Sequence, residues 1–212
     1  ILCKEKFKNI NMLDIKCISE NLIYDSENFC VKYAILEHKI PSLGYSFIKK
    51  DDVSINKERL ESLGCTQGRW IGKLKEQVLK GYQNEEKIII ENKEYSISYL
   101  HNYLFEKKIG EKISYITDTI FNESVEKSVI NLAKDSDIMF CECHYLQKDE
   151  DKAKSYFHLT AKQAGYLANK ATVKSVVGFH YSQRYSDEEI KLIERELDES
   201  FKSCSLQEKL NS

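Results

Sequence analysis

Several features that define particular classes of protein are scarce in this chain. Its 212 residues contain one proline and eight glycines, and neither a collagen-like repeat nor a proline-rich linker is present. No apolar run reaches the roughly 20 residues that a membrane-spanning helix needs. No secretory signal peptide is visible, and the chain begins Ile1-Leu2-Cys3-Lys4-Glu5 without a methionine. We therefore expect a globular chain with no membrane partner.

Charge of one sign is also lacking. Lys and Arg number 32 against 34 Asp and Glu, for a net charge of −2, so any contact with RNA must come from local basic patches. Seven cysteines lie at scattered positions without the paired spacing of a secreted disulfide framework, which predicts a reducing, cytoplasmic location. A hydrophobic content of 42% is enough for one core. We expect a single domain over 1–212, incomplete at its N-terminus because the first residues resemble the middle of a protein.

Hydrophobic periodicity predicts strands first and an alternating pattern later. From Lys112 onward, strands that end near Asp118, Glu142 and His180 alternate with helices, which is typical of a layered α/β protein. The expected strands of the first part are 21–24, 29–36 and 44–48; a helix over 57–63 ends at Gly64, a hairpin covers 87–97, and the later helices are 122–134, 160–169 and 186–201.

Acid and imidazole residues recur at the ends of the apolar runs. A single His or Asp at a strand end is usually a structural residue, but rigid scaffolds also present their chemistry at such positions. Spacing alone leaves both interpretations open, although a repeated coincidence favours a metal-dependent hydrolytic site. The candidate residues are His38, Asp118, Glu142, His158 and His180.

Local sequence words around these residues resemble a known family. Thr117-Asp118-Thr119, Cys141 to Tyr145, His158 to Ala164 and Phe179 to Tyr185 resemble, in order and separation, the C-terminal half of ribonuclease Z, and the turn from His38 to Tyr45 adds a match upstream. Ribonuclease Z is the tRNA 3′-processing endonuclease of the metallo-β-lactamase superfamily. The resemblance implies an α/β fold, a metallo-β-lactamase-like αββα four-layer sandwich of which this chain supplies mainly the C-terminal half. It also implies zinc-dependent removal of the 3′ trailer from precursor tRNA.

The resemblance assigns a role to each candidate residue. His38 corresponds to a ligand of the first zinc, Asp118 to the carboxylate that bridges both ions, and His180 to a ligand of the second. Imidazole and carboxylate suit Zn²⁺, of which a complete site holds two. His158 corresponds to the proton donor, and Glu142 to the acid that fixes its tautomer and favours its protonated form.

Further positions are expected to contact the substrate. Ser182 and Arg184 would lie just past the metal, where structural hydrogen bonding is the alternative. An inserted arm at about 52–86 resembles the segment that grips tRNA in the family, and Arg69, Lys73 and Lys75 within it could meet phosphates. A basic amphipathic helix on a neighbouring subunit is the plainer alternative. Family members are typically homodimers, so we expect self-association.

The chain departs from the family pattern in two places. Cys141-Glu142-Cys143-His144 stands where the family usually has His-Glu-Ala-Thr, and alone it could be a small Cys/His zinc site, although core thiols are the plainer account. The superfamily's His-x-His-x-Asp-His loop is absent from this sequence, so full zinc binding and hydrolysis would require a missing N-terminal half. His144 and His101 receive no role.

Two other functions remain open. A phosphodiesterase or arylsulfatase of the same superfamily, acting on small molecules, would keep the metal residues and need no basic arm. A non-catalytic RNA-binding or assembly module would tolerate loss of Asp118 but not charge reversal at Arg69, Lys73 and Lys75, whereas a hydrolase would show the reverse order of severity.

Overall fold

A computed structural model describes residues 21–81 and 86–210, the stretch 204–210 as backbone alone. These residues form two compact units. One unit comprises the described residues up to Ile48 and from Glu111 onward, and the other is Lys49–Gly110. The second unit contains the described part of the interval predicted as an arm. Within the described ranges, no helix combines the length and apolar character needed to cross a bilayer.

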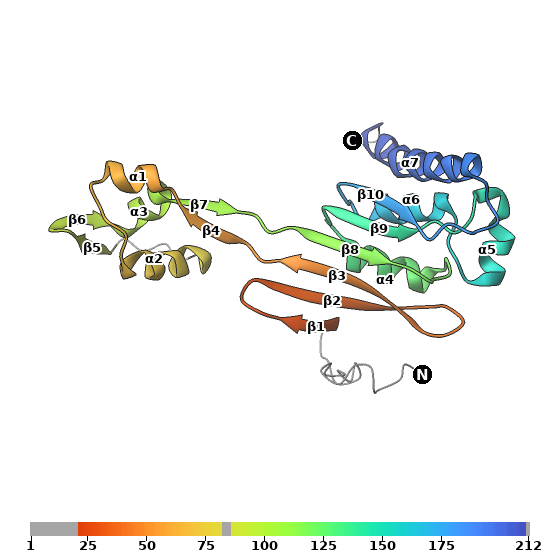
Figure 1. Cartoon of the computed structure of the whole chain (residues 1–212), viewed down its shortest axis with the longest axis horizontal. Helices are drawn as coiled ribbons and strands as arrows, with labels where there is room; N and C mark the ends of the chain where they lie inside the picture. The colour runs from red at the N-terminus through yellow and green to blue at the C-terminus, as the bar shows by residue number, and fades with distance from the viewer. Residues whose placement is uncertain (1–20, 82–85, 211–212) are drawn as a thin grey trace. The chain divides into compact units, whose positions relative to one another are not determined.

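The first unit is built on a six-stranded sheet of order β1-β2-β3-β8-β9-β10 (Figure 1). β1 pairs antiparallel with β2, and β3 with β8, while β8, β9 and β10 run parallel. The predicted α/β class is confirmed. The strands are β1 (Leu22–Asp25), β2 (Phe29–Leu36), β3 (Ser42–Lys49), β8 (Lys112–Ile116), β9 (Ile138–Glu142) and β10 (Val176–Phe179); the helices are α4 (Glu123–Ala133), the 3-10 helix η4 (Gln147–Asp149), α5 (Glu150–Tyr156), α6 (Ala161–Lys170) and α7 (Asp187–Leu210).

One face of this sheet packs against helices. Leu36, Ile116 and Met139 are almost fully buried there and share one core with side chains of α4, α6 and α7. Alternation along each strand places every second residue on this face, which explains the pattern. Gly165 lets α6 approach α7 closely, since a Cβ at this position would lie 2.5 Å from the carbonyl oxygen of Leu197.

The opposite face of the sheet is apolar and largely exposed. Tyr45 pairs in register with Tyr115, Tyr115 with Phe140, and Phe140 with Val177, so one row of apolar side chains crosses four strands. Phe47 and Ile113 form part of a second row. The described residues of the first unit contain one sheet and one helical layer of the predicted four-layer arrangement.

A chain of buried hydroxyl groups joins this sheet to the end of α4. Ser46 Oγ lies 2.6 Å from Ser114 Oγ, which lies 2.7 Å from Ser136 Oγ, and all three residues are fully buried. Ser46 donates to the carbonyl oxygen of Leu132, and Ser136 donates to that of Ala133. These bonds satisfy carbonyl groups that the last turn of a helix leaves without partners.

The second unit has its own small core. β4 (Asp52–Ile55) pairs antiparallel with β7 (Phe105–Lys108), and β5 (Lys87–Ile90) pairs antiparallel with β6 (Lys93–Ser96). Three helices, α1 (Lys57–Ser62), α2 (Arg69–Leu79) and α3 (Ile97–Leu104), bury Leu60, Leu74 and Leu100 together. The predicted helix ends near Gly64, which has a φ of +69°, as expected of a residue that closes a helix.

Candidate metal centre

The five residues singled out by the sequence lie together at one edge of the six-stranded sheet. Because β8, β9 and β10 are parallel, their carboxyl ends meet at the same edge, where Asp118, Glu142 and His180 follow or end a strand. Ser42 donates a 2.6 Å hydrogen bond to the carbonyl oxygen of Asp118 and so ties the turn after His38 to this edge. All these residues belong to the first unit.

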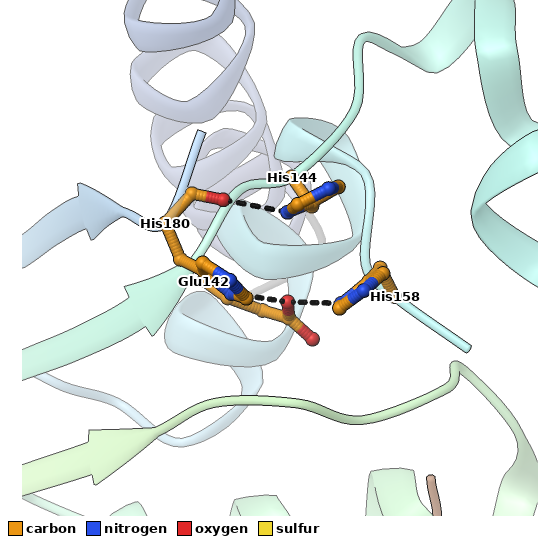
Figure 2. Close-up of side chains that lie close together, drawn as sticks. All are labelled: Glu142, His144, His158 and His180. Carbon is orange, nitrogen blue, oxygen red and sulfur yellow. Dashed lines mark hydrogen bonds and ion pairs between the residues drawn. The ribbon is translucent and has the colours of Figure 1, made fainter. Parts of the chain in front are cut away.

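Glu142 organises the centre from a fully buried position. Its carboxylate accepts hydrogen bonds from His158 Nδ1 at 2.8 Å and from His180 Nδ1 at 3.3 Å (Figure 2). It also accepts one from the backbone N–H of Thr119 at 2.8 Å. Burial acts to raise the pKa of Glu142, but the hydrogen bonds from His158, His180 and Thr119 outweigh it and hold the pKa below its ordinary value. The group is thus a buried carboxylate that orients two imidazoles.

His180 lies between two carboxylates. Its Nδ1 is 3.4 Å from Asp118 Oδ1 as well as 3.3 Å from Glu142 Oε2. The hydrogen bond to Glu142 is the main cause of a raised pKa for His180. With Nδ1 engaged in this way, Nε2 remains to bind a ligand, which is the arrangement of metal-bound histidines whose other nitrogen donates to a carboxylate.

Backbone strain marks the same edge of the sheet. Asp118 and His180 adopt left-handed conformations, with φ of +48° and +59°, and Phe157, directly before His158, has a φ of +66°. Residues other than glycine rarely adopt this region, and where they do the strain is often found at functional sites. Residue spacing could not have predicted these conformations.

The side chains fit a metal ion. His38 Nε2 is buried and has no hydrogen-bond partner among the described residues. His38, Asp118 and His158 each place a potential ligand atom within 4.8 Å of the others. A buried imidazole nitrogen without a partner, facing a carboxylate, is the donor set that zinc prefers. His38 and Asp118 thus lie close enough to share an ion, with His158 as the third residue of that group, and the metal-ligand roles of His38, Asp118 and His180 stay predictions.

His144 lies beside these residues, although no role was predicted for it. Its ring stacks on that of His158, with centroids 4.0 Å apart and an interplanar angle of 14°. Burial is the main cause that lowers the pKa of His144 to about 4. Cys141 and Cys143 lie instead in the helix-facing core, where burial raises the pKa of both thiols. The cysteines therefore behave as core thiols and are not placed to join a Cys/His zinc site.

Two predicted substrate contacts lie next to the centre. Arg184 is stacked over the ring of Tyr145 at 4.9 Å and donates from Nε to Ser182 Oγ at 3.2 Å. The Tyr145 ring is 6.3 Å from that of His158. Arg184 remains exposed, whereas Ser182 is buried and acts as its hydrogen-bond partner.

The remaining predicted contacts lie in the second unit. Arg69 and Lys73 are exposed at positions i and i+4 of α2, so they share one face of the helix. Lys75 is partly buried and forms a 2.9 Å ion pair with Asp52. Of the three basic residues predicted to meet phosphates, Lys75 is therefore already engaged in an ion pair, and Arg69 and Lys73 form the exposed basic face of α2.

Comparison with known proteins adds the family. The chain is 35% identical to a ribonuclease Z of Nanoarchaeum equitans over 178 residues, which cover 84% of the chain and 51% of that protein. It is 31% identical to a ribonuclease Z of Brevibacillus brevis over 180 residues, covering 84% of the chain and 52% of that protein. This chain is a relative of ribonuclease Z. It spans about half the length of the curated ribonucleases Z that it matches, and the resemblance predicted from the sequence words is confirmed.

No protein-family profile matches the chain. The metallo-β-lactamase fold protein YhfI of Bacillus subtilis aligns with a TM-score of 0.47 at 11% identity, covering 84% of this chain and 46% of that one. The short form of human tRNase Z aligns with a TM-score of 0.43 at 21% identity, covering 77% of this chain and 39% of that one.

Proposed function

We propose that this ribonuclease Z relative is the C-terminal half of a zinc-dependent endoribonuclease that removes the 3′ trailer from precursor tRNA. The observation that carries the proposal is the buried Glu142 carboxylate, which holds His158 and His180. His158 lies beside His38, whose Nε2 has no hydrogen-bond partner among the described residues. A complete site would hold roughly two zinc ions, which would activate water and stabilise the charge that develops on the phosphate. His38, Asp118 and His180 would hold them.

The residues of this chain then account for the movement of the proton. In its doubly protonated form, His158 donates a hydrogen bond from Nδ1–H to Glu142 and carries its second proton on Nε2, which is directed away from the carboxylate. When water adds to the phosphorus and the bond to the tRNA 3′ oxygen breaks, that oxygen takes the proton from His158 Nε2. The proton that the water loses passes through solvent and restores the doubly protonated imidazole. The tRNA is left with a 3′-hydroxyl and the trailer with a 5′-phosphate. Arg184 adds positive charge beside the reacting phosphate.

Substrate binding involves the second unit in this proposal. Arg69 and Lys73 form an exposed basic face on α2 that suits the phosphate backbone of tRNA. Contacts of this kind position a nucleic acid without reading its sequence. Lys75 contributes less, because its ammonium group already pairs with Asp52.

The rest of the enzyme is also part of the proposal. The exposed apolar face of the six-stranded sheet, with the row from Tyr45 to Val177, suits packing against a second sheet. We infer that this sheet belongs to the missing N-terminal half, which carries the His-x-His-x-Asp-His loop. The complete protein would be a cytoplasmic homodimer.

Zinc content and cleavage test the proposal together. The purified chain is analysed for zinc alone and after addition of a polypeptide that carries the His-x-His-x-Asp-His region, and precursor tRNA cleavage is assayed in parallel. We expect little zinc in the chain alone, and about two ions per complex once cleavage appears. Asp118→Ala should abolish both zinc binding and cleavage.

Asp135→Ala is the matched control. Asp135 also has a left-handed backbone, with a φ of +57°, but it pairs with Thr172 away from the centre. It should therefore reproduce the backbone effect of the substitution and leave zinc and cleavage intact. Stable zinc in the isolated chain that survives Asp118→Ala would refute the assignment of the metal ligands.

A further inference from the structure

His144 makes two specific contacts that join separate parts of the centre (Figure 2). Its Nδ1–H donates to the carbonyl oxygen of His180 at 2.8 Å, and its ring stacks on His158 at 4.0 Å. In the other direction, the backbone N–H of Ser182 donates to the carbonyl oxygen of His144 at 3.2 Å. His144 therefore connects the loop after β9 with the loop after β10 and with the ring of His158.

The stacking geometry excludes a shared metal ion. An ion bound by imidazole lies close to the plane of the ring, about 2.0–2.1 Å from the nitrogen. The rings of His144 and His158 are inclined by only 14° with centroids 4.0 Å apart, so an ion in the plane of one ring lies outside the plane of the other. The four residues Glu142, His144, His158 and His180 come close together, yet they do not form one ligand set.

The same geometry restrains His158. Its Nδ1 must remain in line with Glu142 Oε2 for the 2.8 Å hydrogen bond, and rotation of the ring about its Cβ–Cγ bond would break that alignment. One ring face is covered by His144, which is itself held by the carbonyl group of His180. Rotation of His158 therefore requires His144 to move and to lose its own hydrogen bond.

We propose that His144 is a positioning residue for His158. Its ring fixes the plane of the His158 imidazole, so that Nδ1 meets Glu142 and Nε2 faces the reacting phosphate. The effect on cleavage rests on the function proposed above, whereas the effect on the His158 ring does not. The stacking interaction between two aromatic rings is strong enough to slow the release of the His158 ring from its hydrogen-bonded position by up to about tenfold.

Two substitutions separate the two contacts. His144→Asn keeps a side-chain N–H near the position of Nδ1 and removes the ring, while His144→Phe keeps a ring and removes the donor. His101→Asn is the matched control, because His101 belongs to the second unit. Far-UV circular dichroism establishes that each variant is folded before it is compared.

Nuclear magnetic resonance at a single fixed pH, on the metal-free chain with ¹⁵N-labelled histidine, measures the restraint. His158→Gln identifies the His158 signals. In the wild-type chain we expect ring-to-ring nuclear Overhauser effects between His144 and His158, and a slowly exchanging His158 Nδ1 proton. This proton should exchange about tenfold faster in His144→Asn, nearly as in the wild type in His144→Phe, and unchanged in His101→Asn.

Kinetics on the complex that cleaves precursor tRNA give the second measurement. His144→Asn should lower kcat by up to about tenfold with little change in KM, and His144→Phe should retain most of kcat. Absence of the ring-to-ring effects in the wild-type chain would overturn the proposal even if neither variant folds. Equal proton exchange in His144→Asn and the wild type would also overturn it. A restrained His158 in a complex that does not cleave precursor tRNA would instead refute the proposed function alone.

Discussion

Two single substitutions, Gly165→Ala and Gly72→Ala, should change the free energy of unfolding in opposite directions. Gly165 in α6 faces α7, where an added Cβ would lie 2.5 Å from the carbonyl oxygen of Leu197 and 2.8 Å from Ser200 Cβ. Ordinary contacts begin at 3.4 Å, so α7 would have to withdraw by about 0.9 Å or its side chains rearrange. Gly72 in α2 has no atom within 4 Å of the same position among the described residues.

The magnitudes follow from two competing terms. Alanine in place of glycine favours a helix by about 1 kcal/mol, and at Gly72 this gain is unopposed. At Gly165, overpacking costs about 1–3 kcal/mol and exceeds the gain. The free energy of unfolding should therefore fall by up to about 2 kcal/mol for Gly165→Ala and rise by up to about 1 kcal/mol for Gly72→Ala.

Denaturant unfolding measures both changes. Trp70 is the single tryptophan and packs in the core of the second unit, so its fluorescence follows the unit that contains Gly72. Far-UV circular dichroism follows the helices of both units, including α6 and α7. An increase in stability for Gly165→Ala as large as that for Gly72→Ala would show that the α6–α7 contact is looser than described.

Three further outcomes are expected. The hydrogen bond from Lys174 is the main cause that lowers the pKa of Asp137. The contribution of Asp137 to the free energy of unfolding is therefore present above the unfolded pKa of about 4 and is lost as the pH falls. In urea titrations, Asp137→Asn should be less stable than the wild type at pH 7 and equally stable near pH 2. Glu142→Gln should lower cleavage by about 100-fold or more, measured as kcat on precursor tRNA, because a neutral amide has one acceptor oxygen and cannot accept from both imidazoles and from the Thr119 N–H at the position of the second oxygen. Near-normal kcat would contradict the role of the carboxylate. Joint replacement of Arg69 and Lys73 by glutamine should weaken tRNA binding and reduce by about two the slope of log affinity against log salt concentration, and an unchanged slope would remove α2 from the interface.

Much of the centre could be predicted because its residues end apolar runs. Asp118, Glu142 and His180 were predicted to belong to one site, and the contacts of His180 with both carboxylates show that they lie together. Parallel strands explain this, because their carboxyl ends meet at one edge. The helices after Asn122 and Thr160 were predictable from their N-caps and their apolar spacing. These features depend on local sequence and on a simple rule of topology.

Other features depend on the folded backbone. The stack of His144 on His158 arises because the loop after β9 meets the segment after α5, and no spacing in the sequence specifies this meeting. Helix α3 was not predicted, because Ile97 was assigned to the end of a hairpin; its N-cap, Ser96, has no acidic residue three positions later to strengthen the signal. The ion pair that engages Lys75 requires β4 beside α2, which is again a tertiary contact.

The three linked serine hydroxyl groups restrict where their hydrogens can lie. Ser46 and Ser136 each use their only hydrogen on a backbone carbonyl group, so Ser114 has the single hydrogen that remains for two oxygen contacts of 2.6 and 2.7 Å. Ser114 can donate to one neighbour at a time, and two arrangements of the same heavy atoms are therefore available. Its replacement by alanine would remove one hydrogen bond, worth about 1 kcal/mol, and leave no donor without an acceptor. Of the three serines, Ser114 is therefore the one whose hydroxyl group can be removed with the smallest loss of hydrogen bonding.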